Sequence, residues 1–258
     1  MKLNYKRTVL IGLAFMSICA FWQMYDNIIP LILQNTYHLG ETMTGAVMAL
    51  DNVLAIFLLP VFGTLSDKVH TKLGRRMPFI VSGTILAVIF MMLLPMIDNA
   101  EKARWNTGES FSNQVIFLAV LFFTLVSMGL YRSPAVALMP DVTPRPVRAK
   151  ADAFNSLMAA AAGIIVLVSI SLAVPDVEHP SYLPVFLIVS GIIVFCTVLF
   201  AVFFRERKAV ERMHEESLAM GIPEEEIELS EEGGQEKESD KTVRRSLLAI
   251  LLLSLIHI

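Results

Sequence analysis

The chain has 258 residues, of which 55% are hydrophobic and 17% are charged. A soluble domain of this size would carry its apolar residues in short amphipathic segments, whereas here they form long uninterrupted blocks. The composition therefore excludes an ordinary soluble domain and predicts an integral membrane protein. Both cysteines, Cys19 and Cys196, fall inside apolar blocks, so we expect no disulfide, metal site or cofactor.

Six apolar blocks are long enough for a transmembrane helix, which needs about 20 residues. In chain order they are residues 8–34, 42–65, 78–97, 113–139, 152–174 and 182–204. The first block is too long for the apolar core of a signal peptide, so we interpret it as a retained span. The prediction is an all-α membrane protein in which residues 1–204 form a six-helix bundle.

The positions of lysine and arginine predict the orientation. With the N-terminus in the cytoplasm, all but three of the 21 basic residues lie on the inner side. The exceptions are Lys102 and Arg104 in an expected outer loop, and Arg132 inside a span. The positive-inside rule therefore favours a cytoplasmic N-terminus, and we expect location in the plasma membrane. The net charge of −3 says little about partners, because the acidic residues concentrate in one tail. We expect no nucleic-acid partner.

The chain after residue 204 differs from the six apolar blocks. Residues 205–245 form a charged cytoplasmic linker, whose first part predicts a short helix ended by Gly221 and Pro223. The acidic remainder is too poor in apolar residues to pack. Residues 246–258 begin a seventh span that is too short to cross a bilayer, so we expect a truncated chain. Residues 253–258 (LSLIHI) match the translation of a sequencing-library adapter, and we interpret them as a sequencing artefact. The alternative is a genuine span that stops at this point.

A bundle of six spans is half of a transporter built from two such bundles, each containing a three-plus-three inverted repeat. The sequence offers a test of that plan. Asp26 precedes Pro30 in the first span, and Arg132 precedes Pro134 at a similar offset in the fourth span. Because the first and fourth spans are counterparts in such a repeat, the matching pattern supports it.

Charges inside the spans form the candidate substrate and cation site. Asp26, Asp51 and Arg132 each cost roughly 2.5–3.5 kcal/mol at a helix centre, so they need partners or water. Asp26 and Asp51 lie about 12 and about 13.5 Å from the outer ends of their spans, at 1.5 Å per residue. Arg132 would hold one acid or bind substrate hydroxyls, and one carboxylate would carry the coupling proton. The neighbouring candidates are Trp22, Gln23, Tyr25, Asn27 and Asn52. The alternative is a buried ion pair that only fixes helix packing, with the aromatic residues filling space.

The loop PVFGTLSDKVHTKLGRRMPFI, residues 60–80, places charges against the helix dipoles. Asp67 ends the second span, where a cation is favoured, and Arg75 and Arg76 begin the third span, where an anion is favoured. We interpret this as a paired latch, with Gly63 allowing close helix approach and Gly74 taking a positive φ. The alternative is that the basic residues only set topology.

The same loop resembles the cytoplasmic motif of the major facilitator superfamily, Gly-x-Leu-x-Asp followed by Gly-Arg-Arg. Its fuller pattern is similar to that of the sucrose–proton symporters and the glycoside–pentoside–hexuronide cation symporters. Residues 133–165 are similar to the span-four-to-five element of the sucrose group. The resemblance implies the N-terminal half of a twelve-span sugar symporter. The gating motif that it implies comprises Gly63, Asp67, Gly74, Arg75, Arg76, Asp141 and Arg148.

Some positions depart from these relatives. The sucrose group has an arginine where this chain has Val136, while Arg132 lies one turn earlier. The acids of the melibiose-type sodium symporters are replaced by Ala55 and Leu59, so a proton is the expected coupling ion. The expected partners are a sugar, a proton, the lipid bilayer and a second six-helix half. The alternatives are a drug or metabolite exporter of the same superfamily and a non-transporting sensor. An enzyme is disfavoured, because His214 lacks the second histidine of a zinc helix.

Overall fold

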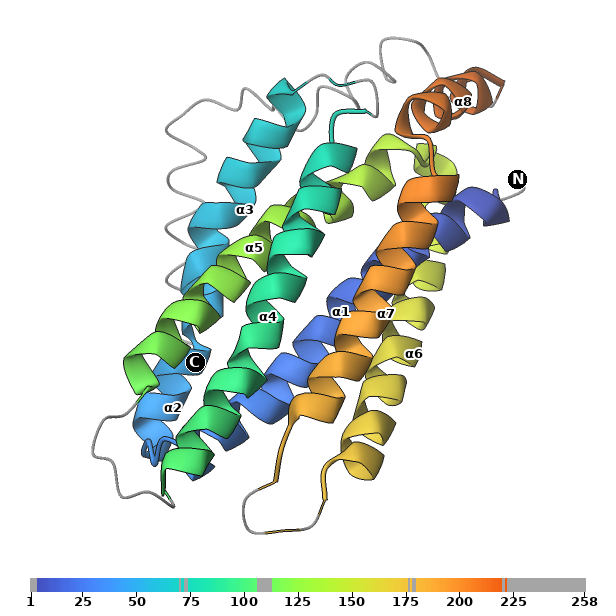
Figure 1. Cartoon of the computed structure of the whole chain (residues 1–258). Helices are drawn as coiled ribbons and strands as arrows, with labels where there is room; N and C mark the ends of the chain where they lie inside the picture. Colours follow the sequence, from blue (N-terminus) through green and yellow to red (C-terminus); the bar gives the residue numbers. More distant parts are fainter. Residues whose placement is uncertain are drawn as a thin grey trace. The chain divides into compact units, whose positions relative to one another are not determined.

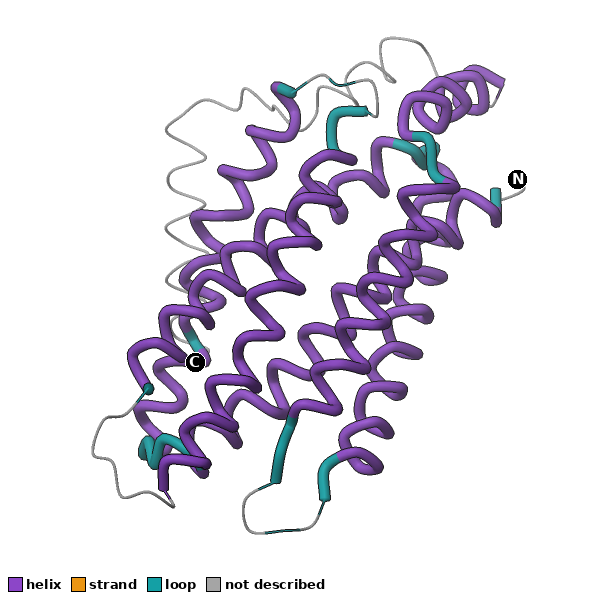
Figure 2. Tube along the Cα trace, in the orientation of Figure 1, coloured by secondary structure: helices purple, strands orange, loops and turns teal. Residues whose placement is uncertain are grey.

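The computed structural model describes residues 4–69, 71, 74–105, 113–175, 177, 180–219 and 221. Within these residues the chain is helical, and no strand is present (Figure 2). The helices are α1 (Tyr5–Asn35), α2 (Glu41–Met48), α3 (Leu50–Lys68), α4 (Met77–Trp105), α5 (Gln114–Asp141), α6 (Arg148–Ala173), α7 (Leu183–Phe203) and α8 (Glu206–Ala219), with a 3-10 turn at Arg145–Val147. The chain divides into a unit of Met1–Met213 and a unit of His214–Ile258, and the fold described below is that of the first unit.

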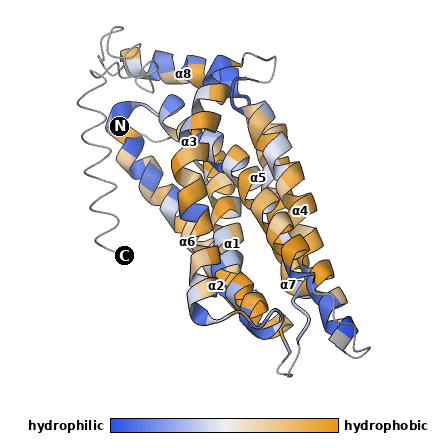
Figure 3. Ribbon diagram, turned by 90° about the vertical axis from the view of Figure 1, so that its left-hand side faces the viewer, coloured by the Kyte–Doolittle hydropathy of each residue, from blue (hydrophilic) through white to orange (hydrophobic). Residues whose placement is uncertain are grey.

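Six spans are long and apolar enough to cross a membrane: α1, α2 with α3, α4, α5, the 3-10 turn with α6, and α7. They correspond in order to the six predicted blocks, which confirms the all-α bundle. Figure 3 shows the hydrophobic colour concentrated along these helices, with hydrophilic residues near their ends. The acidic linker beyond residue 221 and the seventh span at 246–258 lie outside the described residues.

The second span is interrupted, although the sequence predicted a single helix over residues 42–65. Helix α2 ends at Met48 and α3 begins at Leu50. Between them the N–H of Ala49 donates to the carbonyls of Gly45 and Val47. The break places Asp51 in the first turn of α3. Because the N-terminal end of a helix carries partial positive charge, the break stabilises a carboxylate inside an otherwise apolar span.

The packing of the spans has an internal twofold pattern. Helix α1 packs mainly on α6 and α7, while α5 packs mainly on α4 and α3. Helix α4 packs on α7 (Figure 1). In an inverted repeat α1 corresponds to α5, α3 to α6 and α4 to α7. The contact of α1 with α6 then corresponds to that of α5 with α3, and the contact of α1 with α7 corresponds to that of α5 with α4. The packing therefore agrees with a three-plus-three inverted repeat, in which each first span fits between the second and third spans of the other repeat.

The helices differ in how much they bury. Helix α1 supplies a row of fully buried residues, including Ile28, Ile29 and Ile32. Helix α3 buries only Ser66 among its residues. Helix α6 buries four of its residues, namely Ala151, Asn155, Ala162 and Val166. The outward faces of α3 and α6 are apolar, with Phe57 64% exposed and Leu172 83% exposed. These outward faces require lipid or another protein as their neighbour.

Candidate functional site

A small cavity lies among α1, α3 and α5, in the interior of the spans. Trp22, Asp51 and Arg132 line it together with leucines of α3 and α5. The guanidinium of Arg132 lies 5.3 Å from the centroid of the Trp22 ring, a distance typical of a cation–π contact. The cavity measures about 20 Å³, which is room for about one water molecule. Three of the predicted site residues, from three different spans, therefore meet around one cavity.

The other predicted site residues do not all join them. Asp26 is exposed and does not line this cavity. The side-chain amide of Asn27 donates to the carbonyl of Gln23 on its own helix, at 2.7 Å. The amide of Asn52 donates to a carboxylate oxygen of Asp51, at 3.0 Å. Two of the amides are therefore engaged, and Asn52 orients the Asp51 carboxylate.

Arg132 does not hold either acid. Within the described part of the chain it forms no hydrogen bond or ion pair with Asp26 or Asp51. The buried ion pair that the sequence left open as an alternative is therefore not formed among the described residues. The five guanidinium donors stay available to other ligands.

Two aromatic residues beside the cavity have unused hydrogen-bonding groups. Trp22 and Tyr25 lie edge to face, with ring centroids 5.4 Å apart. The indole N–H of Trp22 and the hydroxyl of Tyr25 are buried, and neither has a partner among the described residues. A buried polar group without a partner costs about 1–3 kcal/mol. Such groups are expected where a ligand or water completes the bonding.

A larger cleft of about 600 Å³ borders the other side of Arg132. Phe15, Arg132, Val136, Arg148 and Asp152 are among the residues that line it. Val136, which replaces the arginine of the sucrose group, thus faces the same cleft as Arg132. The sequence analysis did not select Asp152. Its position one turn after Arg148 at the start of a span was the available signal.

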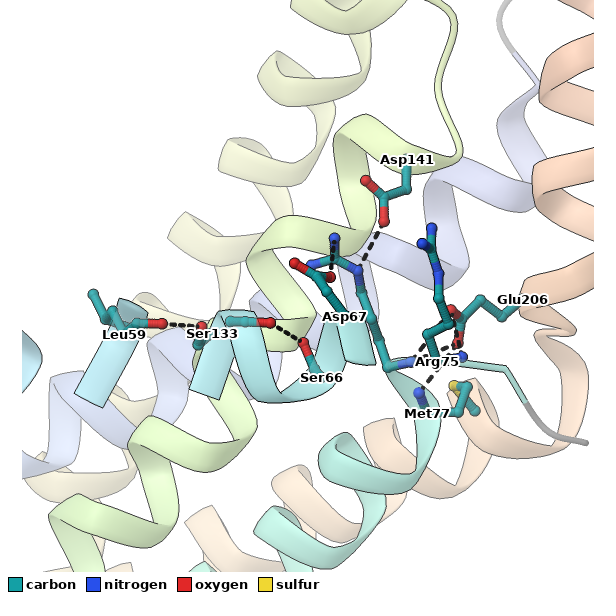
Figure 4. A network of polar contacts seen from close by, with 10 residues as sticks. Leu59, Ser66, Asp67, Arg75, Met77, Ser133, Asp141 and Glu206 are labelled. Atoms are coloured by element: carbon teal, nitrogen blue, oxygen red, sulfur yellow. Dashed lines mark hydrogen bonds and ion pairs between the residues drawn. The ribbon is translucent and has the colours of Figure 1, made fainter. Parts of the chain in front are cut away.

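On the side where α1 begins, Arg76 joins the ends of two other helices. Its guanidinium is 3.2 Å from a carboxylate oxygen of Asp67 at the end of α3. It is also 2.8 Å from a carboxylate oxygen of Asp141 at the end of α5 (Figure 4). The Arg76 side chain is only 8% exposed. The structure therefore brings Asp67, Arg76 and Asp141 together as one ion-pair cluster, which we call the latch.

The start of α4 is closed by a residue that the sequence analysis missed. The carboxylate of Glu206, at the start of α8, accepts hydrogen bonds from the backbone N–H groups of Arg75, Arg76 and Met77 at 2.9–3.2 Å (Figure 4). These are the unpaired donors of the first turn of α4, where a negative charge is favoured. Glu206 is 4% exposed. The first turn of α4 has no acidic residue of its own, and the anion is supplied by Glu206, which is about 130 residues later in the sequence.

The two glycines of the loop have different roles. Gly74 has a φ of +125°, which confirms the predicted positive φ. A side chain at this position would also collide with the carboxylate of Glu206. Gly63 lies against Ser133, with 3.4 Å between an ideal Cβ and the Ser133 hydroxyl. That hydroxyl donates to the carbonyl of Leu59 at 2.8 Å, so α3 and α5 are in close contact here.

Arg148 does not pair with an acid of the latch. Its guanidinium donates to the carbonyls of Thr143 at 2.9 Å and Pro140 at 2.8 Å. Arg148 therefore holds the turn between α5 and α6. Arg75 contributes its backbone N–H, and no ion pair involves its side chain among the described residues.

A second ionic cluster lies at the opposite ends of the spans. Asp98 is 0% exposed and accepts a hydrogen bond from the Thr36 hydroxyl at 2.6 Å. Its other oxygen pairs with the ammonium of Lys102 at 2.7 Å. Lys102 also donates to the carbonyl of Pro180 at 2.6 Å and lies 4.5 Å from the centroid of the Tyr182 ring. Lys102 was assigned to an outer loop, but α4 continues to Trp105, so this lysine ties α4 to the start of α7.

Burial also affects the tyrosines at this end. The pKa of the Tyr37 phenol is raised by its burial and, to a smaller extent, by the nearby carboxylates of Asp98 and Glu101. The Tyr37 phenol therefore stays neutral over the physiological pH range.

Six apolar spans with twofold packing around a charged interior are the arrangement of a membrane transport bundle. Residues 11–256 match the family model of the Major Facilitator Superfamily, and the chain belongs to this superfamily of membrane transporters.

Among curated proteins, the chain is similar to plant sucrose transport proteins. It is 26% identical over 133 residues to sucrose transport protein SUT3 of Oryza sativa subsp. japonica, which covers 48% of this chain and 26% of that protein. It is 32% identical over 93 residues to sucrose transport protein SUC4 of Arabidopsis thaliana, covering 34% of this chain and 18% of that protein. It is 27% identical over 92 residues to SUT5 of Oryza sativa subsp. indica, covering 33% and 17%. The similarity thus spans well under two thirds of the length of each relative.

Proposed function

We propose that the chain is the N-terminal bundle of a secondary active transporter that takes up a sugar or glycoside together with a proton. The observation that carries this proposal is the meeting of Asp51, Arg132 and Trp22 around one cavity. Ionisable groups inside membrane spans face substrate or ion pathways as a rule. The similarity to sucrose transport proteins directs the proposal to sugars.

Each of the three residues has a proposed role. Arg132 and the free indole N–H of Trp22 donate hydrogen bonds to sugar hydroxyls. Asp51 binds the coupling proton, while Asn52 donates a hydrogen bond to one of its carboxylate oxygens. A closed and dehydrated cavity disfavours a charged carboxylate, so closure around the substrate follows protonation of Asp51. The empty transporter returns after the proton has left.

The cavity beside Trp22 is far too small for a sugar, at about 20 Å³. We propose that a second six-helix bundle supplies the other wall of the binding site and covers the apolar faces of α3 and α6. The larger cleft on the other side of Arg132, at about 600 Å³, has the size of a small-molecule site and forms part of the same pathway.

The latch is proposed as the gating element on the cytoplasmic side of the plasma membrane. Arg76 connects the ends of α3 and α5, so the two helices move as one body when the bundles rock. The positive-inside rule supports the orientation, because the latch and the start of α1 share the side that carries most of the basic residues.

The test is uptake of labelled sucrose by cells expressing the complete two-bundle protein, with and without an inward proton gradient. The Asp51→Asn variant should lose gradient-driven accumulation but retain exchange of internal for external sucrose, because exchange needs no net proton movement. Asp26→Asn is the matched control and should keep accumulation. If Asp51→Asn accumulates sucrose normally, Asp51 is not the coupling group, and a loss in the Asp26→Asn variant would assign that role to Asp26.

A further inference from the structure

We propose that a basic pocket formed by the start of α1, the end of α7 and the start of α8 binds the phosphate headgroup of an anionic membrane lipid. The pocket measures about 350 Å³. Its cationic lining residues are Lys6, Arg7, Arg205, Lys208 and Arg212. Its apolar lining residues are Leu10, Phe203, Phe204 and Ala209. Figure 1 shows the N-terminal end of α1 next to the junction between α7 and α8.

The first argument is charge. Five cations line the pocket, and none of its lining residues is acidic. In the part of the chain that the structure describes, no carboxylate pairs with Lys6, Arg205, Lys208 or Arg212. Glu206 is next to Arg205 in sequence, but its carboxylate is directed to the start of α4. Clustered cations repel one another, so an anion bound among them is stabilised.

The second argument is that the pocket is held in place by the fold. Arg7 is only 9% exposed, and its guanidinium donates to the carbonyl of Ala209 at 3.4 Å. This contact joins two segments that are 202 residues apart in the sequence. Lys208 and Arg212 are four residues apart on α8 and so lie on one face of that helix. The cations therefore converge through tertiary structure and are not a run of basic residues in the sequence.

The third argument favours a lipid over a soluble anion. Helix α7 ends at Phe203, where the apolar span gives way to charged chain. Phe203 is 67% exposed and lines the pocket together with Leu10. A phospholipid has the same sequence of chemistries, with a charged phosphate above an apolar chain. Basic pockets between spans on the cytoplasmic side are known to bind such headgroups. Under the proposed orientation this pocket opens to the inner leaflet.

The experiment measures lipid binding to the purified 258-residue chain in detergent, by native mass spectrometry and thermal unfolding. The probes are phosphatidylglycerol, phosphatidylcholine and the soluble headgroup glycerol 3-phosphate. We expect saturable binding of phosphatidylglycerol and a raised melting temperature, with neither effect from phosphatidylcholine. Glycerol 3-phosphate at the same concentration should have no effect. Because transport is not measured, the outcome is independent of the proposed sugar symport.

A matched pair of variants locates the site. The double variant Lys208→Gln/Arg212→Gln should weaken phosphatidylglycerol binding by about 30-fold, since each basic residue near a membrane surface contributes roughly fivefold. The control Arg145→Gln/Lys150→Gln removes two exposed cations from another connection on the same side and should change binding less than twofold.

Four results would overturn the proposal. Equal binding of both lipids would remove the role of charge, and equal losses in the two double variants would indicate diffuse surface attraction. A response to glycerol 3-phosphate that matches the response to phosphatidylglycerol would assign the pocket to a soluble anion. If phosphatidylglycerol binds only after the acidic residues of 224–240 are replaced by glutamine, the chain's own acidic segment fills the pocket.

Discussion

Replacing Glu206 by alanine should strongly destabilise the six-helix bundle. The carboxylate accepts hydrogen bonds from three backbone N–H groups at 2.9–3.2 Å and is almost completely buried. Without it, these donors lose their partner, and the partial positive charge at the start of α4 loses the anion that the donors bind. Each stranded donor costs about 1–3 kcal/mol, but the costs of neighbours are not additive. We therefore expect a loss of about 3–5 kcal/mol for the Glu206→Ala variant.

The assay is reversible unfolding of the purified chain in mixed detergent micelles with increasing sodium dodecyl sulfate, followed by circular dichroism. Glu206→Gln retains one carbonyl acceptor without the charge, so its loss should be smaller, at about 1–2 kcal/mol. Glu211→Ala is the matched control, because Glu211 is an exposed glutamate on the same helix and no ion pair involves it among the described residues. Its effect should stay within about 0.5 kcal/mol. If Glu206→Ala and Glu211→Ala unfold at the same detergent fraction, the capping role of Glu206 is refuted.

Three other changes should have measurable effects. Gly74→Ala combines a strained positive φ with a collision against Glu206, so it should lower the unfolding free energy by about 2–4 kcal/mol, and a double-mutant cycle with Glu206→Ala should show strong non-additivity. Lys102→Met leaves the buried Asp98 carboxylate unpaired and should cost about 3–5 kcal/mol, while adding Asp98→Asn should restore much of the loss; no recovery in the double variant would argue against the ion pair. Arg132→Lys in the complete transporter should raise the KM for sucrose at least tenfold, because an ammonium cannot stack on Trp22 and donate in several directions at once; an unchanged KM would remove Arg132 from the sugar site.

The spans could be predicted because their cause is local. About 20 apolar residues in a row have no other stable location than a bilayer or a large core, so the blocks were identified without knowledge of the packing. The interruption at Ala49 carried no such signal. Neither proline nor glycine lies at this position.

The latch could be predicted in part because its charges violate local rules. Asp67 at a helix C-terminus and Arg76 at a helix N-terminus both need a compensating partner, and their conflict was visible in the loop itself. Glu206 violates no rule, since an acid in the first turn of α8 is ordinary. Its contacts with residues 75–77 cross 129–131 positions and exist only after the spans have packed.

The candidate site residues could also be predicted only in part. The depth estimate placed Asp26 and Asp51 at the same level, and the sequence could not tell them apart. What separates them is rotation about the helix axes: Asp51 faces Arg132 across a cavity, whereas Asp26 lies exposed. Rotation depends on which faces of α1 and α3 pack against α5, and a strongly apolar span has little amphipathic pattern from which this could be read.

The cap on α4 has a consequence for how the protein is made. The ribosome synthesises the start of α4 long before Glu206. Helix α4 therefore enters the membrane with the first N–H groups of its backbone still hydrated. These N–H groups find their hydrogen-bond acceptor only after α7 has been inserted and Glu206 has been synthesised. Folding of the bundle is therefore complete only when the start of α8 has been made. Nascent chains that stop before residue 206 should be recognised as incompletely folded by membrane quality control.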